Sequence, residues 1–232
     1  MEGPPVTAFC GLTPAKPAIR ALSLFVCLTC VASYAAAQEV RFRWAFGAVT
    51  GSGAARHFAP ITDEMTLYSG DELKLFISPG CPCFIYVLHQ DQTGEFTVLF
   101  PAGGSFGDAP PPIGSMHYIP PAQAWLRLDE AGGTERVYLI ASTTRLTPLE
   151  RLLTANPSTP TQVAPAREIV VELARLQKDH TAHNWSERPV TMGGQVRGDR
   201  GVDSAHPDIA RSATEITGSA PFFSRVFIID HR

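Results

Sequence analysis

The chain has 232 residues, of which 44% are hydrophobic and 18% charged, and its formal net charge at pH 7 is −3. A chain of this length can bury one sizeable core without covalent staples, and its mildly acidic balance lacks the electrostatic footprint of a nucleic-acid-binding protein. Only two of its 5 cysteines, Cys81 and Cys83, lie after the first 37 residues, so a disulfide-rich scaffold is not expected.

The N-terminal segment has the order of features found in a secretory signal peptide. Lys16 and Arg20 precede an uncharged apolar run over residues 21–31, and three small residues at 35–37 stand before Gln38. The apolar run, about 11 to 13 residues long, is shorter than the roughly 20 residues that cross a bilayer. The pattern therefore predicts a signal peptide that is cleaved before Gln38.

Cleavage would make residues 1–37 the signal peptide and leave residues 38–232 as an exported protein, periplasmic or secreted. No later segment is long and apolar enough to span a membrane, so no transmembrane segment is expected after signal removal. An uncleaved membrane anchor and a lipoprotein attached at Cys30 are the alternatives.

Short runs with alternating apolar residues, bounded by Gly, Pro and Asp, dominate the rest of the chain and predict β-strands. The first run places Val40, Phe42, Trp44 and Phe46 on one face. A Gly- and Ala-rich loop is expected over residues 47–60, and an exposed loop over Ala102–Gly114. The predicted strands are Gln38–Phe46, Glu72–Ser78, Cys83–His89, Glu95–Phe100, Met116–Ile119, Trp125–Leu128, Thr134–Ser142 and Phe222–Asp230.

Two helices are predicted between the last two strands. Thr147–Leu153 starts with a capping-box spacing and a proline at the first helical position, and Ala166–Asp179 carries an apolar stripe at helical spacing. Residues 186–220 have little periodicity and are expected to be loop or partly disordered. The apolar final strand is expected to return and pair within the fold, with Phe223, Phe227 and Ile229 on the core face.

About eight strands joined mostly as hairpins, with two inserted helices, predict a mostly β protein with an antiparallel β-sandwich fold. A small β-barrel is the alternative. We expect one β-rich domain over residues 38–232. It would consist of a central part at 66–153, a helix and loop insertion at 154–220 and a closing strand at 222–230.

The central part carries several sequence elements in a recognisable order. They are LYSGDELKLFI at 67–77, FIYVLHQDQTGEFTVLFP at 84–101, YIPP at 118–121 and GGTERVYLIAST at 132–143. Over about residues 66–153 the chain resembles the bacterial family known as domain of unknown function 4384 (DUF4384). The resemblance implies a β-rich, exported or envelope-associated protein without an established activity or a catalytic motif.

The polar residues do not form a strong catalytic or metal-binding motif. His180 and His183 have a spacing that could place two metal ligands on one helix face, but a solvated helix end explains them more simply. Asp199, Asp203 and a nearby His206/Asp208 pair miss the spacing of a calcium loop. We therefore expect no metal and no cofactor.

Two of the cysteines, Cys81 and Cys83, follow the predicted signal peptide and flank Pro82. Residues i and i+2 of a strand are near the distance limit for a disulfide, so the pair could close a small ring or remain reduced and buried. The free state is favoured. A Cys–His hydrolase would need one of these cysteines beside His89 or His117.

The three tryptophans are candidates for stacking on a sugar ring. The alternation places Trp44 and Trp125 in the core. Trp185 follows the long helix in a polar stretch and is therefore the weak candidate for an exposed binding residue.

These observations favour an exported envelope protein that is a non-catalytic binding or assembly module. Its partner is expected to be another envelope protein or a cell-wall component, and not nucleic acid. A cell-wall or glycan-binding module and a hydrolase are the alternatives.

Overall fold

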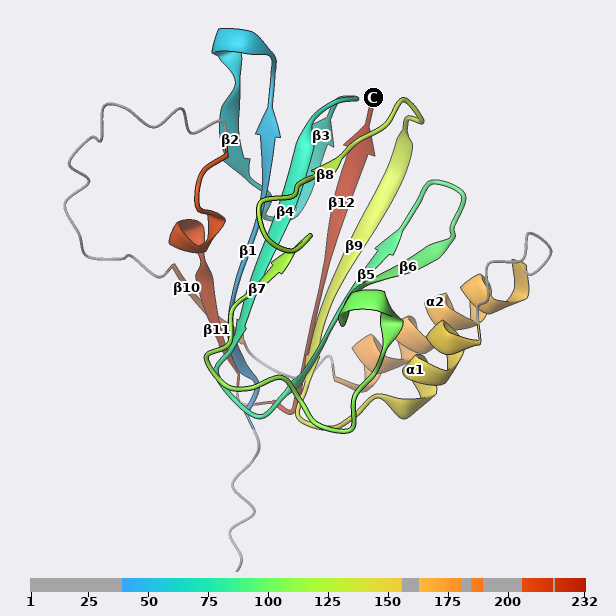
Figure 1. Ribbon diagram of the computed structural model, residues 1–232. Coiled ribbons are helices and arrows are strands. Elements are labelled where there is room, and N and C mark those ends of the chain that lie inside the picture. Colours follow the sequence, from blue (N-terminus) through green and yellow to red (C-terminus); the bar gives the residue numbers. More distant parts are fainter. Residues whose placement is uncertain (1–38, 156–162, 181–184, 190–205, 219) are drawn as a thin grey trace, which may run out of the picture. The chain divides into compact units, whose positions relative to one another are not determined.

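The computed structural model describes residues 39–155, 163–180, 185–189, 206–218 and 220–232. The predicted signal peptide lies outside these residues. The described residues form two β-sheets and two α-helices, with the C-terminus at the end of a strand inside the second sheet (Figure 1).

The first sheet contains 7 strands and the second 5. In the first sheet the order is β10 (Trp185–Pro189), β11 (Thr214–Gly218), β1 (Arg41–Thr50), β4 (Glu72–Pro79) and β7 (His117–Ile119), with β2 (His57–Pro60) beside β1 and β8 (Leu126–Arg127) beside β4. In the second the order is β3 (Glu64–Leu67), β12 (Phe222–His231), β9 (Gly133–Ser142), β5 (Phe84–Gln90) and β6 (Phe96–Phe100).

Neighbouring strands are antiparallel except for the parallel pair of β12 and β3. The sheets remain separate layers in the described part of the chain and do not close into a barrel. The predicted sandwich is therefore confirmed.

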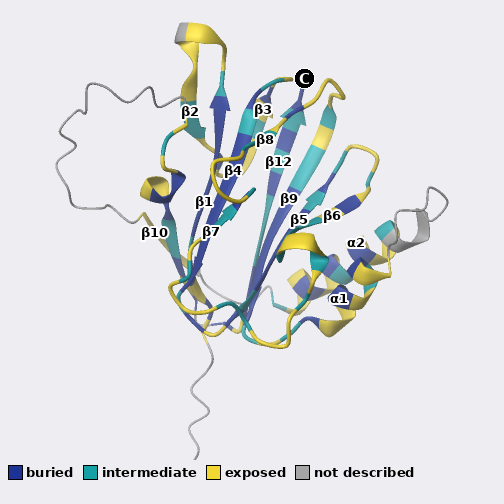
Figure 2. Ribbon diagram, viewed as in Figure 1, coloured by how far each residue is buried: buried dark blue, intermediate teal, exposed yellow. Residues whose placement is uncertain are grey.

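The main core lies between the two sheets, where the buried faces of the strands meet (Figure 2). Aromatic side chains of β1 pack against those of β12: the ring centroids of Phe42 and Phe223 lie 5.2 Å apart, and those of Trp44 and Phe227 5.1 Å apart. Such pairs bury large apolar areas in offset or edge-to-face geometry. The predicted core face of the last strand is confirmed, because Phe223, Phe227 and Ile229 are all buried.

The other face of the second sheet is covered by α1 (Thr147–Thr154) and α2 (Val163–Asp179). The α2 stripe of Ile169, Leu173 and Leu176 packs with Tyr138 and Ile140 of β9. This second cluster explains why β5 and β9 are apolar on both faces: one face lies on the sandwich core and the other beneath the helices.

The β5–β6 turn forms as predicted. The Asp91 carboxylate accepts the backbone N–H groups of Thr93 and Glu95, each at 2.9 Å, and Gly94 has a φ of 88°. A residue with a side chain is strained at this φ.

The start of α1 differs from the capping box. Its N-cap residue is Leu146, which has no side chain able to cap, and Thr147 is already helical. Glu150 does not reach back to the helix start. It accepts hydrogen bonds from the Tyr86 hydroxyl at 2.7 Å and from Arg145 Nε at 2.6 Å, joining the helix to β5.

Two loop predictions are wrong in the part of the chain that the structure describes. Residues 47–60 are not all loop, because β1 continues to Thr50 and β2 pairs with it. Residues 186–220 include most of β10, the short 3-10 helix η3 (Ile209–Ser212) and β11, and β11 pairs directly with β1. The insertion between α2 and β12 thus adds an edge to the first sheet.

The outer face of the first sheet carries η3. Phe76 of β4 is buried there with Ala45, Ile209 and Ala213. No helix among the described residues is long and apolar enough to cross a membrane.

Candidate functional site

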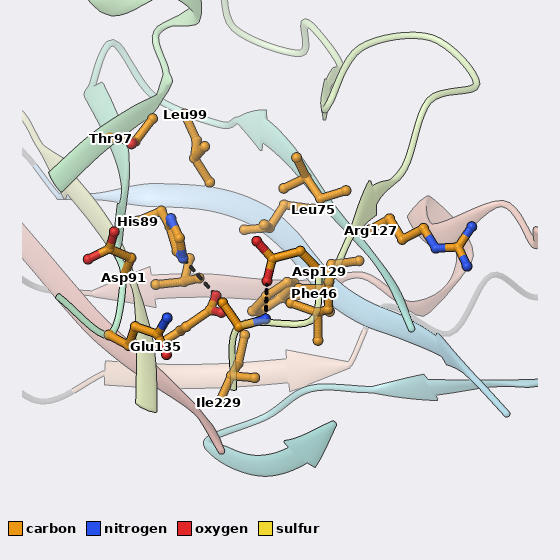
Figure 3. Close-up of a pocket in the computed structure, with 16 residues that line it drawn as sticks. Phe46, Leu75, His89, Asp91, Thr97, Leu99, Arg127, Asp129, Glu135 and Ile229 are labelled. Carbon is orange, nitrogen blue, oxygen red and sulfur yellow. Dashed lines mark hydrogen bonds and ion pairs between the residues drawn. The ribbon is translucent and has the colours of Figure 1, made fainter. Parts of the chain in front are cut away.

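A pocket of about 320 Å³ lies between the two sheets, beside the β5–β6 turn and the loop between β8 and β9 (Figure 3). We call it the mouth pocket. Its apolar wall continues the sandwich core and is formed by Phe46, Leu73, Leu75, Leu99, Leu126, Leu128, Val137 and Ile229. Its polar residues are His89, Asp91, Gln92, Thr97, Arg127, Asp129 and Glu135.

Strand alternation places the polar groups at this end. Val137 faces the core in β9, so Glu135, two residues earlier, faces the same way. By the same rule His89 follows Val87 on the inner face of β5. The inner faces are therefore apolar in the middle of these strands and polar at the end.

Glu135 is the centre of a hydrogen-bonded chain. Its carboxylate accepts from His89 Nε2 at 2.8 Å and from His231 Nδ1 at 3.1 Å, and the His231 side chain is fully buried. On its other side His231 Nε2 lies 3.3 Å from the Ser69 hydroxyl. The hydrogen bond from His89 is the main cause that lowers the pKa of Glu135 below its ordinary value, against the opposing effect of burial.

Ser69, His231 and Glu135 have the connectivity of a Ser–His–Glu catalytic triad, which sequence reasoning missed. A triad also needs free N–H donors beside its nucleophile, to stabilise the oxyanion. Here the backbone N–H groups of Ser69, Gly70 and Asp71 already donate to the carbonyls of Arg232, Leu128 and Tyr68. The geometry thus favours a structural tie that holds the C-terminal strand, and gives no support to acyl transfer.

Cys81 and Cys83 are free and buried thiols in the structure. The Arg41 backbone N–H donates to Cys81 Sγ at 3.2 Å, and Cys83 Sγ donates to the Cys81 carbonyl at 3.4 Å. The pKa of Cys81 is lowered to about 7, chiefly by its hydrogen bond with the Cys83 side chain, whereas the pKa of Cys83 is raised. Their redox state in an oxidising compartment remains a prediction.

The structure does not join a cysteine to a histidine among these residues. His89 is bonded to Glu135, and His117 Nε2 lies 2.8 Å from the Ser115 hydroxyl. The Cys–His pair that a hydrolase would need is therefore not assembled in the described residues.

The three tryptophans differ in what the structure shows of their burial. Trp44 is buried in the core, as predicted. Trp125 is only half-buried and lines a second pocket, so the prediction that it fills the core is wrong. Trp185 begins β10 and its backbone pairs with Gly218, but its side chain lies outside what the structure describes, and its predicted exposure stays a prediction.

Those candidate metal ligands that the structure describes do not form a metal site. His180 stacks on Phe222 with ring centroids 4.5 Å apart, and Asp208 caps η3. His206 is bonded to Glu72. His183, Asp199 and Asp203 lie outside the described residues. Within the described ranges no group of three or more His, Cys, Asp or Glu residues could hold a metal ion.

Comparison with protein families matches residues 66–145 to the family described as Domain of unknown function (DUF4384). No curated protein and no solved structure matches the chain. The matched residues run from β3 to the end of β9 and beyond it to Arg145, and they supply most of the mouth pocket. The resemblance noted in the sequence is thereby confirmed: the chain contains a DUF4384 domain over residues 66–145.

Proposed function

We propose that this chain is an exported, non-catalytic binding module, and that the mouth pocket holds an apolar group with a positively charged end. The observation that carries the proposal is the pocket itself, an apolar recess that continues the core and ends in carboxylates. Ligand sites in proteins commonly combine apolar walls with a few convergent polar groups.

The polar end of the pocket favours a cation. Asp129 accepts the Ala131 N–H at 2.8 Å through one oxygen, and Asp91 likewise uses one oxygen in its turn. Each therefore keeps a second oxygen for a ligand. Arg127 also lines the pocket, but its guanidinium points away from the other labelled side chains (Figure 3).

The apolar wall supplies affinity. Burying about 100 Å² of apolar ligand surface stabilises a complex by roughly 2.5 kcal/mol before the entropy of binding is counted. An occupant of suitable size is a lysine side chain of an envelope protein, or another alkylammonium group. The apolar run and small residues before Gln38 support export, which would bring the module into contact with such partners.

The test uses a photo-crosslinking residue at Thr97, on the pocket rim, or at Val171, which is 62% exposed on α2. In intact cells the Thr97 probe should capture a specific envelope component, and the Val171 probe should not. Leu99→Trp fills the pocket and should abolish the cross-link formed from Thr97. Val171→Trp adds the same side chain away from the pocket and should leave that cross-link in place. Equal capture from both positions, or capture that survives Leu99→Trp, would contradict the proposal.

A purified-protein measurement tests the charge preference. Hexylammonium should bind saturably and raise the unfolding temperature, and hexanoate should bind much more weakly because the rim carboxylates repel it. Preference for hexanoate would refute the assignment of a cationic ligand.

Glycan recognition is a second candidate function. It is favoured by one observation, the position of Trp125 in a polar pocket on the outer face of the first sheet.

A further inference from the structure

A second pocket, of about 340 Å³, lies on the outer face of the first sheet, on the opposite side of that sheet from the mouth pocket. We call it the outer pocket. Its floor is Lys74 of β4, and the loop before β8 and the segment before η3 form its walls. Its lining includes Lys74, Tyr118, Ala122, Trp125, His206 and Asp208.

Lys74 is a buried charged side chain that holds one wall in place. The residue is only 4% exposed, and its ammonium donates to the carbonyls of Ala122 at 2.6 Å and Ala124 at 2.7 Å. Burial lowers its pKa. Two of its three N–H groups are used in this way, and the third remains for a ligand.

The same ammonium lies near two aromatic rings. It is 5.6 Å from the ring centroid of Tyr118 and 5.6 Å from that of Trp125. The loop that carries Trp125 includes Ala122 in a left-handed conformation, with a φ of 55°. Such a backbone is strained for a residue with a side chain and persists only where its surroundings fix it. Lys74 supplies that fixation, so Trp125 is held at the pocket and not in the core.

The opposite wall carries the acceptor. Asp208 accepts the Ala210 N–H at 3.1 Å as the cap of η3, and the Tyr118 hydroxyl lies 3.5 Å from the same carboxylate oxygen. His206 packs its ring against Trp125, with centroids 4.9 Å apart, and is bonded to Glu72. Both walls are therefore fixed by contacts that do not involve a ligand.

The charges and polar groups together select a class of ligand. Lys74 and Asp208 carry opposite charges, and Asp208 also lies 3.7 Å from Arg211 Nε, so the pocket favours a ligand without net charge. The pocket offers N–H and O–H donors beside carboxylate and amide acceptors, and indole and phenol rings beside both. The hydroxyl groups of a sugar ring can each donate and accept a hydrogen bond, and the C–H face of the ring can stack on an indole or phenol ring. A sugar can therefore contact all of these groups at once.

We propose that the outer pocket binds a neutral saccharide. The site is separate from the mouth pocket and does not depend on the ligand of that pocket. It gives the predicted glycan-binding alternative a location that differs from Trp185.

The test titrates the purified protein with a tetramer of N-acetylglucosamine and follows binding by calorimetry and by ligand NMR. Trp125→Ala should weaken binding at least tenfold. Asp208→Asn should also weaken it, while keeping the cap of η3, because Asn caps as well as Asp does. Tyr68→Ala, at a tyrosine that is 60% exposed elsewhere, is the matched control and should leave the affinity unchanged.

Thermal unfolding of each variant shows whether it is folded, and Asp208→Asn keeps the test decisive if Trp125→Ala does not fold. No saturable binding, binding that both pocket variants leave unchanged, or a preference for an anionic uronic-acid tetramer would each overturn the proposal. Leu99→Trp in the mouth pocket should leave saccharide binding intact. The two proposals can therefore fail independently.

Discussion

The most demanding test of this fold is the replacement of Phe227 by alanine. Phe227 is fully buried in β12, and its ring lies 5.1 Å from the centroids of both Trp44 and Phe46, across the sandwich on β1. Removing a buried phenylalanine ring leaves a cavity and typically costs about 3–5 kcal/mol. A domain of this kind is stable by only about 5–15 kcal/mol, so the variant should lose a large share of its stability.

Urea unfolding followed by tryptophan fluorescence and circular dichroism measures this loss, because Trp44 contacts the substituted ring. Phe227→Leu retains most of the side-chain volume and should cost clearly less than Phe227→Ala. Tyr68→Ala, on the exposed β3–β4 turn, should stay within about 0.5 kcal/mol of the wild type. A loss below about 1 kcal/mol for Phe227→Ala would contradict the packing of this ring against Trp44 and Phe46, because such a truncation typically costs about 3–5 kcal/mol.

Four further predictions follow from the same contacts and from the sequence. Truncation after Ala220 removes β12, which lies between β3 and β9 in the second sheet, and should give insoluble or protease-sensitive protein. A soluble product that melts like the full chain would contradict this. Glu135→Gln should lower the free energy of unfolding by about 1–3 kcal/mol at neutral pH, because it weakens the hydrogen bonds that His89 and His231 donate to the carboxylate. Because the pKa of Glu135 in the folded protein is lowered from 4.5, its contribution to the free energy of unfolding is complete above pH 4.5 and is lost as the pH falls through the folded pKa. Urea unfolding should therefore show a smaller difference in stability between wild type and Glu135→Gln at acidic pH than at neutral pH. An unchanged difference would refute the assignment. N-terminal sequencing of the exported protein should begin at Gln38, and retention of residues 21–37 would disprove cleavage there. Thiol labelling after unfolding should modify both Cys81 and Cys83, whereas a chain two hydrogens lighter that takes no label would establish a disulfide.

Most long strands could be predicted because their alternation reports burial directly. The first half of β1 alternates, because Phe42 and Trp44 lie on the main core while Arg41 and Arg43 point to the other face. Its second half is buried on both faces, since Ala45 packs on the outer side with Ile209 of η3. In β9 the apolar residues are nearly continuous, because both faces of the second sheet are covered. In both strands the local pattern is the consequence of the layer in which the strand lies.

The strands that were missed have no such pattern. β11 buries the side chain of Ile216 in the main core. Its backbone pairs with Arg41–Trp44, 170 to 176 positions earlier in the chain, and with β10 on its other side. β3 is 4 residues long and is held by parallel pairing with β12. Backbone pairing between distant segments leaves little trace in composition, so short edge strands resemble loops in a sequence.

Trp125 shows a different limit. Alternation within a four-residue strand placed it in the core, but β8 itself has only 2 residues, and Trp125 precedes them in the loop. Its position is decided by Lys74, whose ammonium binds carbonyls of that loop. A lysine on the outer face of a strand is ordinarily read as a solvated residue, so its role could not be seen without the fold.

The polar end of the mouth pocket depends both on strand alternation, which can be read from the sequence, and on long-range strand pairing, which cannot. Strand alternation alone places His89, Glu135 and His231 on the inner faces of β5, β9 and β12, because each stands two positions from a buried apolar residue of the core. What alternation cannot supply is the register. Only the pairing of Val137 with His89 and of Ile229 with Glu135 brings the three inner positions to one end of the sheet. Inward charges are costly unless they are paired or face a pocket, and here Glu135 does both: it pairs with two histidines and lines the cavity. Inward polar residues at the ends of neighbouring strands are therefore the signal from which such a site could have been sought, and the long-range register determines whether it forms.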